Sequence, residues 1–409
     1  MSGIRGLSEI FTKYMKHTYD VIVVGAGPAG SMAALHAAKG GASVLLLEKD
    51  RDVGCPVRCA EGVGIESMKG VVDIRPEWIA NRIDRFRIIA PNGISGEPDI
   101  DKVDPDIGGR GYILNRKVFD YDLAMMAVEA GADLHTKAYV HGLVTSNGSV
   151  EGVRVRLLHR EHQIKAEIII GADGVESRVG KWAGIDTTTN FEFMASAAQM
   201  TLANINVEPD LCEFYVGSKV APGGYFWIFP KSSHEANVGC AVDPKRSKTK
   251  KAIEFVREFV AERFPNASIM STVAGGIPGE PTLDTIVKDN VLLVGDAAHQ
   301  ANPFNGGGIA SGMKAGIIAG EVAATAIKTG SLKVLNSYPK RWNKLLGRKH
   351  RMLYRLASTI YSLSDETYNK VGDILADLPP EKLTLRHLIQ AVLLQHPSLL
   401  KDLFIFGRF

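Results

Sequence analysis

The feature that most constrains this chain is a glycine-patterned turn that directly follows a fully apolar strand. The apolar segment 21–24 leads into Gly25, Gly27 and Gly30, which satisfy the G-x-G-x-x-G pattern with Ala29 inside it. The first glycine permits the tight turn, the second lets a pyrophosphate approach the backbone, and the third allows the next helix to pack on the strand. The unpaired N–H groups at the start of that helix face the phosphates. The turn therefore predicts a dinucleotide site of unspecified kind.

A second apolar strand, residues 43–47, strengthens this interpretation because it ends on an acidic residue. Glu48 lies 18 residues beyond Gly30, close to the spacing of about 20 expected for an acid that binds a ribose hydroxyl. The alternative, a strand-turn-helix unit with incidental glycines, does not explain the coincidence of strand, turn, helix and acid. The helix is expected from about Ser31 to Lys39, ended by the glycine pair that follows.

Bulk composition narrows the class of protein. The chain has 409 residues, of which 45% are hydrophobic and 23% charged, as in a soluble globular protein of two or three domains. The net charge of +3 comes with no nucleic-acid-binding signature, so no nucleic acid partner is expected. Four cysteines are too few and too unevenly spaced for a disulfide scaffold, which favours a reducing, cytoplasmic setting.

Neither the start of the chain nor its uncharged segment predicts a targeting or membrane-spanning element. Residues 1–14 have no long apolar stretch and are expected to form a disordered extension ahead of Met15. The segment 21–38 carries no formal charge, but its three glycines and Pro28 favour a buried strand and turn. We therefore expect no transmembrane helix.

Strand and helix patterns along the chain predict an α/β fold with a β-rich second domain. A helix is expected from Arg116 to about Gly131, and a hairpin over 152–170 feeds a buried strand. A further buried strand ends in Gly295-Asp296, and a long helix follows from about Ile309. The predicted organisation is a discontinuous Rossmann-type domain (15–185 and 275–345), an antiparallel β-sheet substrate domain (186–274) and a C-terminal helical region (346–409).

Three separated stretches of the sequence indicate which dinucleotide the site binds. The glycine turn, Gly171–Gly174 and Gly295–Ala298 occur in the order and approximate spacing found in FAD enzymes that resemble p-hydroxybenzoate hydroxylase. The resemblance implies an FAD-binding domain in which Gly25, Gly27, Gly30 and Glu48 hold the ADP half, Arg116 lies beside the phosphates, Val140 lies near the adenine, Asp173 anchors the pyrophosphate side and Asp296 binds the ribitol.

Two of these positions also have a direct physical interpretation. A carboxylate at the end of a buried strand, such as Asp296, needs hydrogen-bond donors, and ribitol hydroxyls supply them. The alternative is a helix N-cap. Glycines 306–308 allow main-chain N–H groups to reach the electron-accepting edge of a flavin, and the dipole of the next helix stabilises reduced, anionic flavin. Gly308 and Ile309 are the predicted contacts.

Two further motifs resemble the geranylgeranyl reductase family. Residues 222–230 fit P-x-x-Y-x-W-x-F-P, and residues 56–62 fit the loop that accompanies it in that family. The resemblance is greatest to archaeal members that saturate the isoprenoid chains of ether lipids. It implies that the Cys-Ala-Glu-Gly loop lies against the flavin, which adds Cys59, Ala60 and Gly62 to the expected FAD contacts.

The aromatic strand in the first motif predicts two different faces. With a period of two, Tyr225, Trp227 and Phe229 share one face, while Phe226 and Ile228 share the other. One face could line a tunnel for a polyprenyl chain, whose burial yields roughly 25 cal/mol per Å². If the face of Tyr225 and Trp227 lines this tunnel, both are candidate catalytic residues. The alternative is that all five side chains fill a sandwich core.

The cysteines offer a candidate acid rather than a metal site. Cys55 and Cys59 are spaced C-x-x-x-C, which matches neither a thioredoxin-type pair nor a zinc site. Cys59 is a candidate flavin-adjacent proton donor; a held water, or a purely structural role for the cysteine, are the alternatives. Cys212 and Cys240 are expected in the core, and no metal site is predicted.

The expected reaction saturates an isolated alkene, with hydride from flavin N5 and a proton from a nearby acid. Electrons are expected from NAD(P)H or a ferredoxin, because no second dinucleotide fingerprint is visible. The sequence Gly-Asp-Ala-Ala-His, which ends at His299, resembles that of flavin monooxygenases at this position. An aromatic or polyprenyl monooxygenase is therefore one alternative. An electron-transfer flavoprotein that reduces quinone is another.

A basic segment near the C-terminus predicts a further partner. No acidic residue lies between Glu321 and Asp365, whereas nine basic residues accumulate from Lys328 to Arg355. This helical region is a candidate contact for anionic membrane lipid or for an acidic electron donor. A solvated helix face is the alternative. The expected localisation is cytoplasmic, with peripheral association at the membrane.

Overall fold

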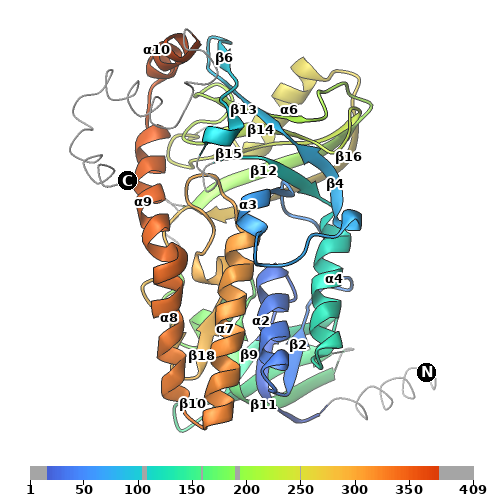
Figure 1. Cartoon of the computed structure of the whole chain (residues 1–409), viewed down its shortest axis with the longest axis vertical. Helices are drawn as coiled ribbons and strands as arrows, with labels where there is room; N and C mark the ends of the chain where they lie inside the picture. The colour runs from blue at the N-terminus through green and yellow to red at the C-terminus, as the bar shows by residue number, and fades with distance from the viewer. Residues whose placement is uncertain (1–15, 104–107, 158–159, 189–193, 249, 377–409) are drawn as a thin grey trace.

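The computed structural model describes residues 16–103, 108–157, 160–188, 194–248 and 250–376 (Figure 1). The predicted extension and the last part of the predicted helical region lie outside the described residues. In Figure 1 one sheet with its helices fills the lower half of the molecule, a second sheet fills the upper half, and a column of C-terminal helices runs alongside both.

The lower sheet has eight strands, and its centre is parallel. Strand β1 lies between β11 and β2, and all three run in the same direction. The carboxyl ends of parallel strands meet at one edge, so the turns after β1, β2, β11 and β18 lie together there. The path through the sheet is β17 (Val287–Lys288), β18 (Val291–Leu293), β11 (Arg160–Gly171), β1 (Thr18–Val24), β2 (Val44–Leu47) and β8 (Asp133–His135), while β10 (Ser149–Leu157) and β9 (Ala138–Ser146) extend antiparallel from β11.

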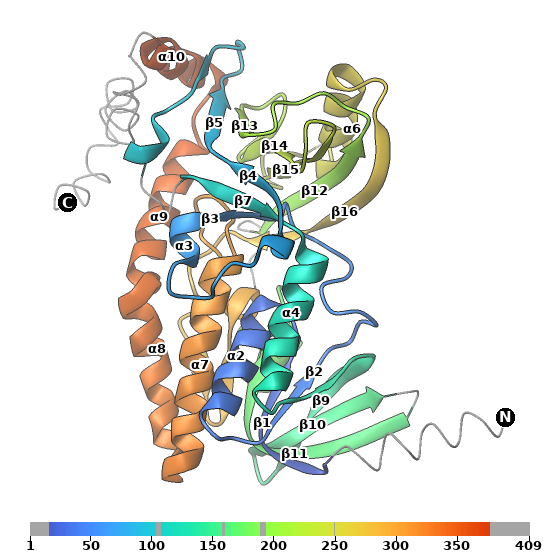
Figure 2. The same ribbon diagram turned by 45° about the vertical axis from the view of Figure 1, so that its right-hand side comes forward.

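Three roughly parallel helices cover one face of this sheet (Figure 2). The predicted first helix is confirmed, although it begins at Pro28 rather than Ser31 because proline is favoured at the first helical position. It packs against α7 through glycines: a Cβ on Gly316 would lie 2.2 Å from the carbonyl oxygen of Ala29, and one on Gly320 would lie 2.4 Å from that of Ala33. The helices are α2 (Pro28–Lys39), α4 (Arg116–Glu129) and α7 (Ile309–Thr329).

The upper sheet has seven strands, and one face is covered by α6 (Ala252–Arg263). Its pairings are antiparallel except that between β13 and β5. The predicted substrate domain, 186–274, therefore omits two strands of this sheet that come much earlier in the chain, and it stops short of the end of β16. The order is β16 (Ser268–Pro278), β12 (Met194–Ala203), β15 (Glu235–Val242), β14 (Tyr225–Pro230), β13 (Leu211–Val216), β5 (Arg85–Ile89) and β6 (Ser95–Gly96).

A small three-stranded sheet joins the two halves (Figure 2). Its outer strand β4 is followed, after a single residue, by β5 of the upper sheet. It consists of β3 (Gly62–Gly64), β7 (Gly111–Leu114) and β4 (Ile79–Ile83), with the short helix α3 (Ile65–Met68) beside it and 3₁₀ turns at Pro76–Trp78 and Ile100–Lys102.

The C-terminal region is helical in its described part, as predicted. Tyr338 is fully buried, and its hydroxyl donates to the carbonyl oxygen of Leu293 at 2.8 Å, which fixes this region to β18. No helix of the described residues is long and apolar enough to cross a membrane. The helices are α8 (Ser337–Trp342), a π-helical turn (Asn343–Gly347), α9 (Arg348–Ile360) and α10 (Asp365–Ala376); elsewhere lie α5 (Arg178–Trp182) and 3₁₀ turns at Gly295–Ala298 and Leu332–Asn336.

The mixed α/β architecture with a Rossmann-type sheet and a second β-sheet confirms the predicted fold class. The core of the lower half is formed where β1, β2 and β11 meet α2, α4 and α7. A separate cluster in the upper half fills the space between the seven-stranded sheet and α6. The edge where the parallel strands end faces the upper half, which places the candidate site between the two sheets.

Candidate active site

The three glycines of the turn meet different surroundings. A Cβ on Gly25 would lie 2.3 Å from the carbonyl oxygen of Ala172, and one on Gly30 would lie 1.9 Å from that of Gly25. Gly25 also has a φ of +105°, which favours glycine. At Gly27, by contrast, a Cβ would meet nothing within 4 Å. Two glycines are thus required by the protein itself, while the middle one faces open space at the start of α2.

Glu48 holds the turn through both carboxylate oxygens. Its Oε2 accepts from the N–H of Ala26 and its Oε1 from the N–H of Asp50, each at 2.9 Å. Glu48 also lines a small cavity of about 190 Å³ that includes Gly27 and Arg116. Glu48 therefore lies beside the glycine turn, and its contact with a ribose hydroxyl stays a prediction.

Asp173 carries an unsatisfied oxygen at the same edge. Its Oδ2 accepts from the N–H of Val179 at 2.9 Å, but its Oδ1 is buried without a hydrogen-bond partner among the described residues. Burial raises the pKa of this carboxyl. A buried acceptor without a donor is costly unless a bound group satisfies it.

Asp296 lies across from the glycine turn, within the 3₁₀ turn that follows β18. Burial raises the pKa of its carboxyl, and the nearby Arg116 guanidinium opposes that shift. The residue is not the N-cap of this turn, which is Val294. Gly308 is the N-cap of α7 and approaches Asp296 closely: a Cβ there would lie 3.2 Å from its Oδ1. Ile309 is the first residue of α7.

Arg116 opens α4 and pairs with an acid one turn later. Its Nε donates to Oδ1 of Asp120 at 2.6 Å, and a terminal nitrogen donates to Oδ2 at 2.7 Å. This bidentate geometry fixes the guanidinium. Arg116 lines both the small cavity and the main one.

The Cys59 loop is bound to the upper sheet by side chains of that sheet. The side-chain amide of Gln199 donates to the carbonyl oxygen of Cys59 at 3.0 Å, and that of Asn237 donates to the carbonyl oxygen of Ala60 at 3.2 Å. The Sγ of Cys59 accepts from the N–H of Glu61 at 3.2 Å, and burial raises the pKa of the thiol. The loop is thus held in place, and Cys59 is among the residues that line the main cavity.

The two faces of β14 differ as the alternation predicts. Phe226 and Ile228 pack into the cluster beneath α6, where Phe226 stacks on Phe259 with ring centroids 4.1 Å apart. Tyr225, Trp227 and Phe229 line the main cavity instead. The indole N–H of Trp227 donates to Oε1 of Gln199 at 3.1 Å, which links the strand to the Cys59 loop.

The main cavity has a volume of about 810 Å³ and connects these groups. It begins at the glycine turn, the Asp173 region and the start of α7, passes the Cys59 loop and the aromatic face of β14, and ends beneath the β5–β6 hairpin and α10. The residues that line this far end are mostly apolar and include Phe86, Ile88, Ala90, Ile94, Phe214, Tyr368 and Val371.

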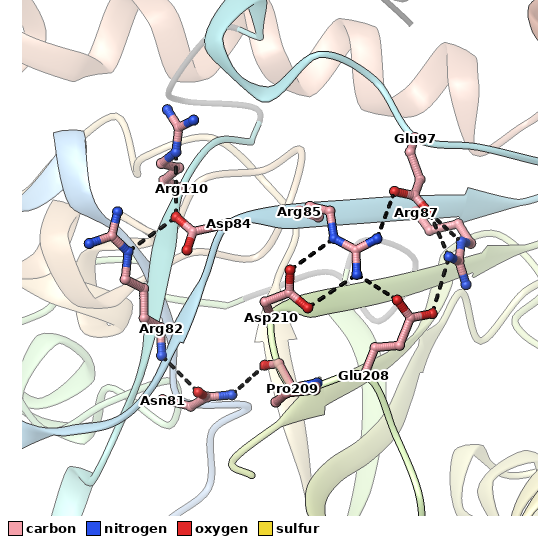
Figure 3. Close-up of polar contacts among 10 residues, drawn as sticks. All are labelled: Asn81, Arg82, Asp84, Arg85, Arg87, Glu97, Arg110, Glu208, Pro209 and Asp210. Atoms are coloured by element: carbon pink, nitrogen blue, oxygen red, sulfur yellow. Dashed lines mark hydrogen bonds and ion pairs between the residues drawn. The ribbon is translucent and has the colours of Figure 1, made fainter. Parts of the chain in front are cut away.

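Strand β5 forms one wall of this apolar end, and charged residues of the same strand belong to an ion-pair network (Figure 3). Phe86 and Ile88 line the cavity, whereas Arg85 and Arg87 alternate with them. Arg85 donates to both oxygens of Asp210, at 2.9 and 3.1 Å, and Arg87 donates to Glu97 at 2.9 Å. The network joins β5 to the segment before β13 and to the segment after β6.

Two sequence predictions are not brought to the cavity. Val140 lies in β9, buried in the cluster between β9, β10 and β11, and it lines neither described cavity. Alignment to a family placed it near the adenine, but its side chain faces the core. His299 is fully buried and also lies outside the cavity lining, so the monooxygenase-like residue does not face the site.

Sequence reasoning missed Gln199, Asn237 and the partners of Glu61. Gln199 and Asn237 are side-chain amides within mostly apolar strands, which is the signal that could have marked them. Both side chains are buried, and their amide N–H groups donate to the loop. Among the residues that the structure describes, no cluster of His, Cys, Asp or Glu is arranged to hold a metal ion.

Comparison with known proteins decides the family. Residues 194–277 match the model of the geranylgeranyl reductase catalytic domain, and residues 20–58 match that of FAD dependent oxidoreductases. Digeranylgeranylglycerophospholipid reductase 1 of Methanococcoides burtonii is 41% identical over 95% of both chains. The digeranylgeranylglycerophospholipid reductase of Methanocella arvoryzae is also 41% identical, over 95% of this chain and 99% of its own.

The chain belongs to the geranylgeranyl reductase family. A geranylgeranyl bacteriochlorophyll reductase-like protein from Thermoplasma acidophilum has a similar structure, with a TM-score of 0.86 and 32% identity over 95% of this chain and 98% of its own. The chondrochloren halogenase CndH shares the fold, with a TM-score of 0.67 at 17% identity over 93% and 97% of the chains. The predicted family resemblance is therefore confirmed.

The site of this geranylgeranyl reductase family member fits FAD, as predicted. Gly27 leaves open space at the N-terminus of α2, where a pyrophosphate would approach the N–H groups. The buried Oδ1 of Asp173 lacks a donor that a bound cofactor would supply. Gly306, Gly307 and Gly308 line the cavity ahead of α7, whose N-terminus would face the flavin.

Proposed function

We propose that this chain is an FAD-dependent reductase that saturates C=C bonds in the geranylgeranyl chains of lipids. These lipids would be precursors of archaeal-type ether phospholipids. The observation that carries the proposal is the continuity of the 810 Å³ cavity from the glycine turn to the apolar end beneath β5 and α10. One end suits a dinucleotide and the other suits an apolar chain. The curated relatives at 41% identity support the same substrate class.

Reduced FAD, when bound, supplies a hydride from N5 of the flavin. The residues of this chain have other tasks. An isolated alkene has no carbonyl to polarise it, so the enzyme depends on placing the double bond and on supplying a proton to the second carbon. The apolar lining desolvates the chain, and the aromatic face of β14 fixes its path past the Cys59 loop.

We assign the proton to the Cys59 thiol. Its Sγ accepts the N–H of Glu61, so the S–H bond is free to point into the cavity that the residue lines. Burial raises the pKa of the thiol, which keeps it protonated at neutral pH. Tyr225 is a weaker candidate because its hydroxyl donates to the carbonyl oxygen of Asn305 at 2.7 Å. Tyr225 and Trp227 would then position the loop and the substrate.

The test is anaerobic turnover of a geranylgeranyl ether lipid by the holoenzyme reduced with dithionite. Mass spectrometry should show a gain of two hydrogens for each double bond, and the Cys59→Ser variant should slow this reaction. A hydroxylated product formed with oxygen consumption would instead identify a monooxygenase. Reduction of a quinone without any change to the lipid would identify an electron-transfer flavoprotein.

We also propose that the column of C-terminal helices meets an anionic membrane surface. Lys340, Lys344, Arg348, Arg351 and Arg355 are exposed along it, at spacings that keep several on one helical face. Leu345 is 51% exposed among them. Basic residues with exposed leucine are typical of peripheral lipid binding.

Liposome co-sedimentation tests this contact. Binding should be stronger to anionic than to neutral vesicles and should fall with salt. A variant with Lys344, Arg348 and Arg351 changed to glutamate should lose it. If sedimentation is unchanged by that reversal, the basic face serves another partner, of which a ferredoxin is the first to test. Stopped-flow flavin reduction with NADH, NADPH and ferredoxin would identify the electron donor.

A further inference from the structure

Lys231 forms a nearly buried ion pair with the loop that carries Cys59. It directly follows β14 and continues the alternation that places Tyr225, Trp227 and Phe229 on the cavity side. Its Nζ donates to Oε2 of Glu61 at 2.7 Å, and the two side chains are only 18% and 6% exposed. Breaking such a pair is costly, because removal of one charge leaves the other buried and uncompensated.

Glu61 makes three further contacts that connect the two halves of the molecule. Its Oε2 also accepts from the side-chain amide of Asn237 at 2.8 Å. Its Oε1 accepts from the N–H of Arg116 at 3.1 Å, in the first turn of α4, where a negative charge is stabilised by the helix dipole. Its carbonyl oxygen accepts from the N–H of Leu114 at 2.9 Å. One carboxylate thus joins the upper sheet to α4.

The backbone of Glu61 needs these contacts. Its φ of +69° lies in the left-handed region, which is unfavourable for a residue with a side chain and persists where the surroundings enforce it. The N–H of the same residue donates to the Cys59 Sγ. The direction of that N–H, and with it the position of the sulfur, therefore depends on how the Glu61 side chain is held.

We propose that Lys231 is a positioning residue for the reductase reaction. By neutralising Glu61, it fixes the left-handed turn of the loop and so places the Cys59 thiol towards the reacting end of the cavity. The inference rests on the proposed function for its catalytic consequence. Its structural part, control of the Cys59 sulfur by Lys231, stands independently and has its own readout.

The experiment compares three variants of the full-length holoenzyme. Lys231→Met removes the ammonium and keeps an unbranched side chain that is one heavy atom shorter. Lys231→Arg keeps the charge. Lys250→Met is the matched control, because Lys250 pairs with the exposed Glu258 away from the loop. Each is made with Cys55→Ser, so that Cys59 is the reactive thiol; Cys212 and Cys240 are buried.

The first readout is the rate of Cys59 alkylation by iodoacetamide, located by mass spectrometry. Lys231→Met should raise it by about tenfold, equivalent to about 1.4 kcal/mol of lost local stability. Lys231→Arg should restore most of the protection, and Lys250→Met should match the parent. An alkylation rate unchanged in Lys231→Met, with the fold retained by circular dichroism, overturns the proposal.

The second readout is the kinetics of lipid reduction. Lys231→Met should lower kcat by a larger factor than it raises KM, because the thiol is misplaced while the apolar lining is intact. A change confined to KM would contradict a positioning role. If the parent enzyme reduces no lipid, the proposed function fails, and the alkylation series still decides whether Lys231 controls the sulfur.

Discussion

The hydroxyl of Tyr225 donates to the backbone carbonyl oxygen of Asn305 at 2.7 Å, which ties the cavity-facing edge of β14 to the glycine-rich loop before α7. A second tyrosine supports the same loop: Tyr361 of the C-terminal region donates to the carbonyl oxygen of Phe304 at 2.6 Å and stacks on Tyr225 with ring centroids 6.2 Å apart. Side chains from two distant regions therefore set the position of the loop that would lie against the flavin.

Replacing Tyr225 with phenylalanine should loosen this loop without emptying the core. A hydrogen bond of this kind contributes about 0.5–1.5 kcal/mol to stability, and urea denaturation should show a loss of that size. Lipid reduction should slow because the loop is less well fixed. Tyr121→Phe, at a residue 52% exposed, is the control. Equal effects of both changes would contradict the assignment.

Alanine at Gly30 should destabilise the apoprotein, whereas alanine at Gly27 should weaken FAD binding and leave the stability of the apoprotein nearly unchanged. At Gly30 the new Cβ overlaps the Gly25 carbonyl oxygen at 1.9 Å, so the apoprotein should lose about 1–3 kcal/mol or more. At Gly27 a new Cβ would meet nothing within 4 Å, so the free energy of unfolding of the apoprotein should differ from that of the parent by no more than about 0.5 kcal/mol. FAD titration of Gly27→Ala should nevertheless show weakened binding. Unchanged FAD affinity would place the pyrophosphate elsewhere.

Glutamine at Glu48 should weaken FAD binding through the turn. The carboxylate accepts two backbone N–H groups, and hydrogen bonds to a charged group are worth about 1.5–3 kcal/mol. Glu48→Gln retains one acceptor, so the dissociation constant for FAD, measured by flavin fluorescence, should rise by about tenfold or more. Glu66→Gln, at the exposed Lys69 pair, should bind FAD like the parent.

The pH dependence of apoprotein stability should reveal the Asp173 carboxyl. Burial raises its pKa in the folded state, so the folded protein binds this proton more tightly than the unfolded chain does. Its contribution is therefore most favourable below the unfolded pKa and is lost as pH rises through the folded pKa. Asp173→Asn should be more stable than the parent near neutral pH, and the gap should close as pH falls. Parallel stability curves would refute this.

The outer network on β5 should matter little for global stability. Arg85 is 39% exposed and Asp210 is 45% exposed, and pairs of that exposure usually contribute less than about 1 kcal/mol, screened by salt. Arg85→Gln should cost no more than that in thermal unfolding, and the difference should shrink at high salt. A loss of several kcal/mol would mean that the network, rather than strand pairing, holds the cavity wall.

Local patterns in the sequence predict much of the candidate site. The glycine spacing and the alternation of Tyr225 and Trp227 with Phe226 depend on neighbours in the chain, and the structure places them as predicted. The bond from Gln199 to Cys59 spans 140 residues, and that from Lys231 to Glu61 spans 170. Such pairs depend on how one sheet faces a loop of the other half, which periodicity does not encode.

The same reasoning explains the misplaced elements. Strand β5 pairs in parallel with β13, more than 120 residues later, so no hairpin signal marks it as part of the upper sheet. The expected place of Val140 near the adenine comes from the family resemblance; its side chain packs in the core, which leaves only its backbone groups for a contact with the cofactor.

The glycine contacts between α2 and α7 have a consequence for how this enzyme could change during evolution. The two helices touch backbone to backbone, and both begin at the edge where the parallel strands end. The separation of their N-termini is therefore set by main-chain atoms and does not vary with side-chain size. Substitutions in the upper sheet can reshape the apolar end for a new chain while the span available to the cofactor stays constant.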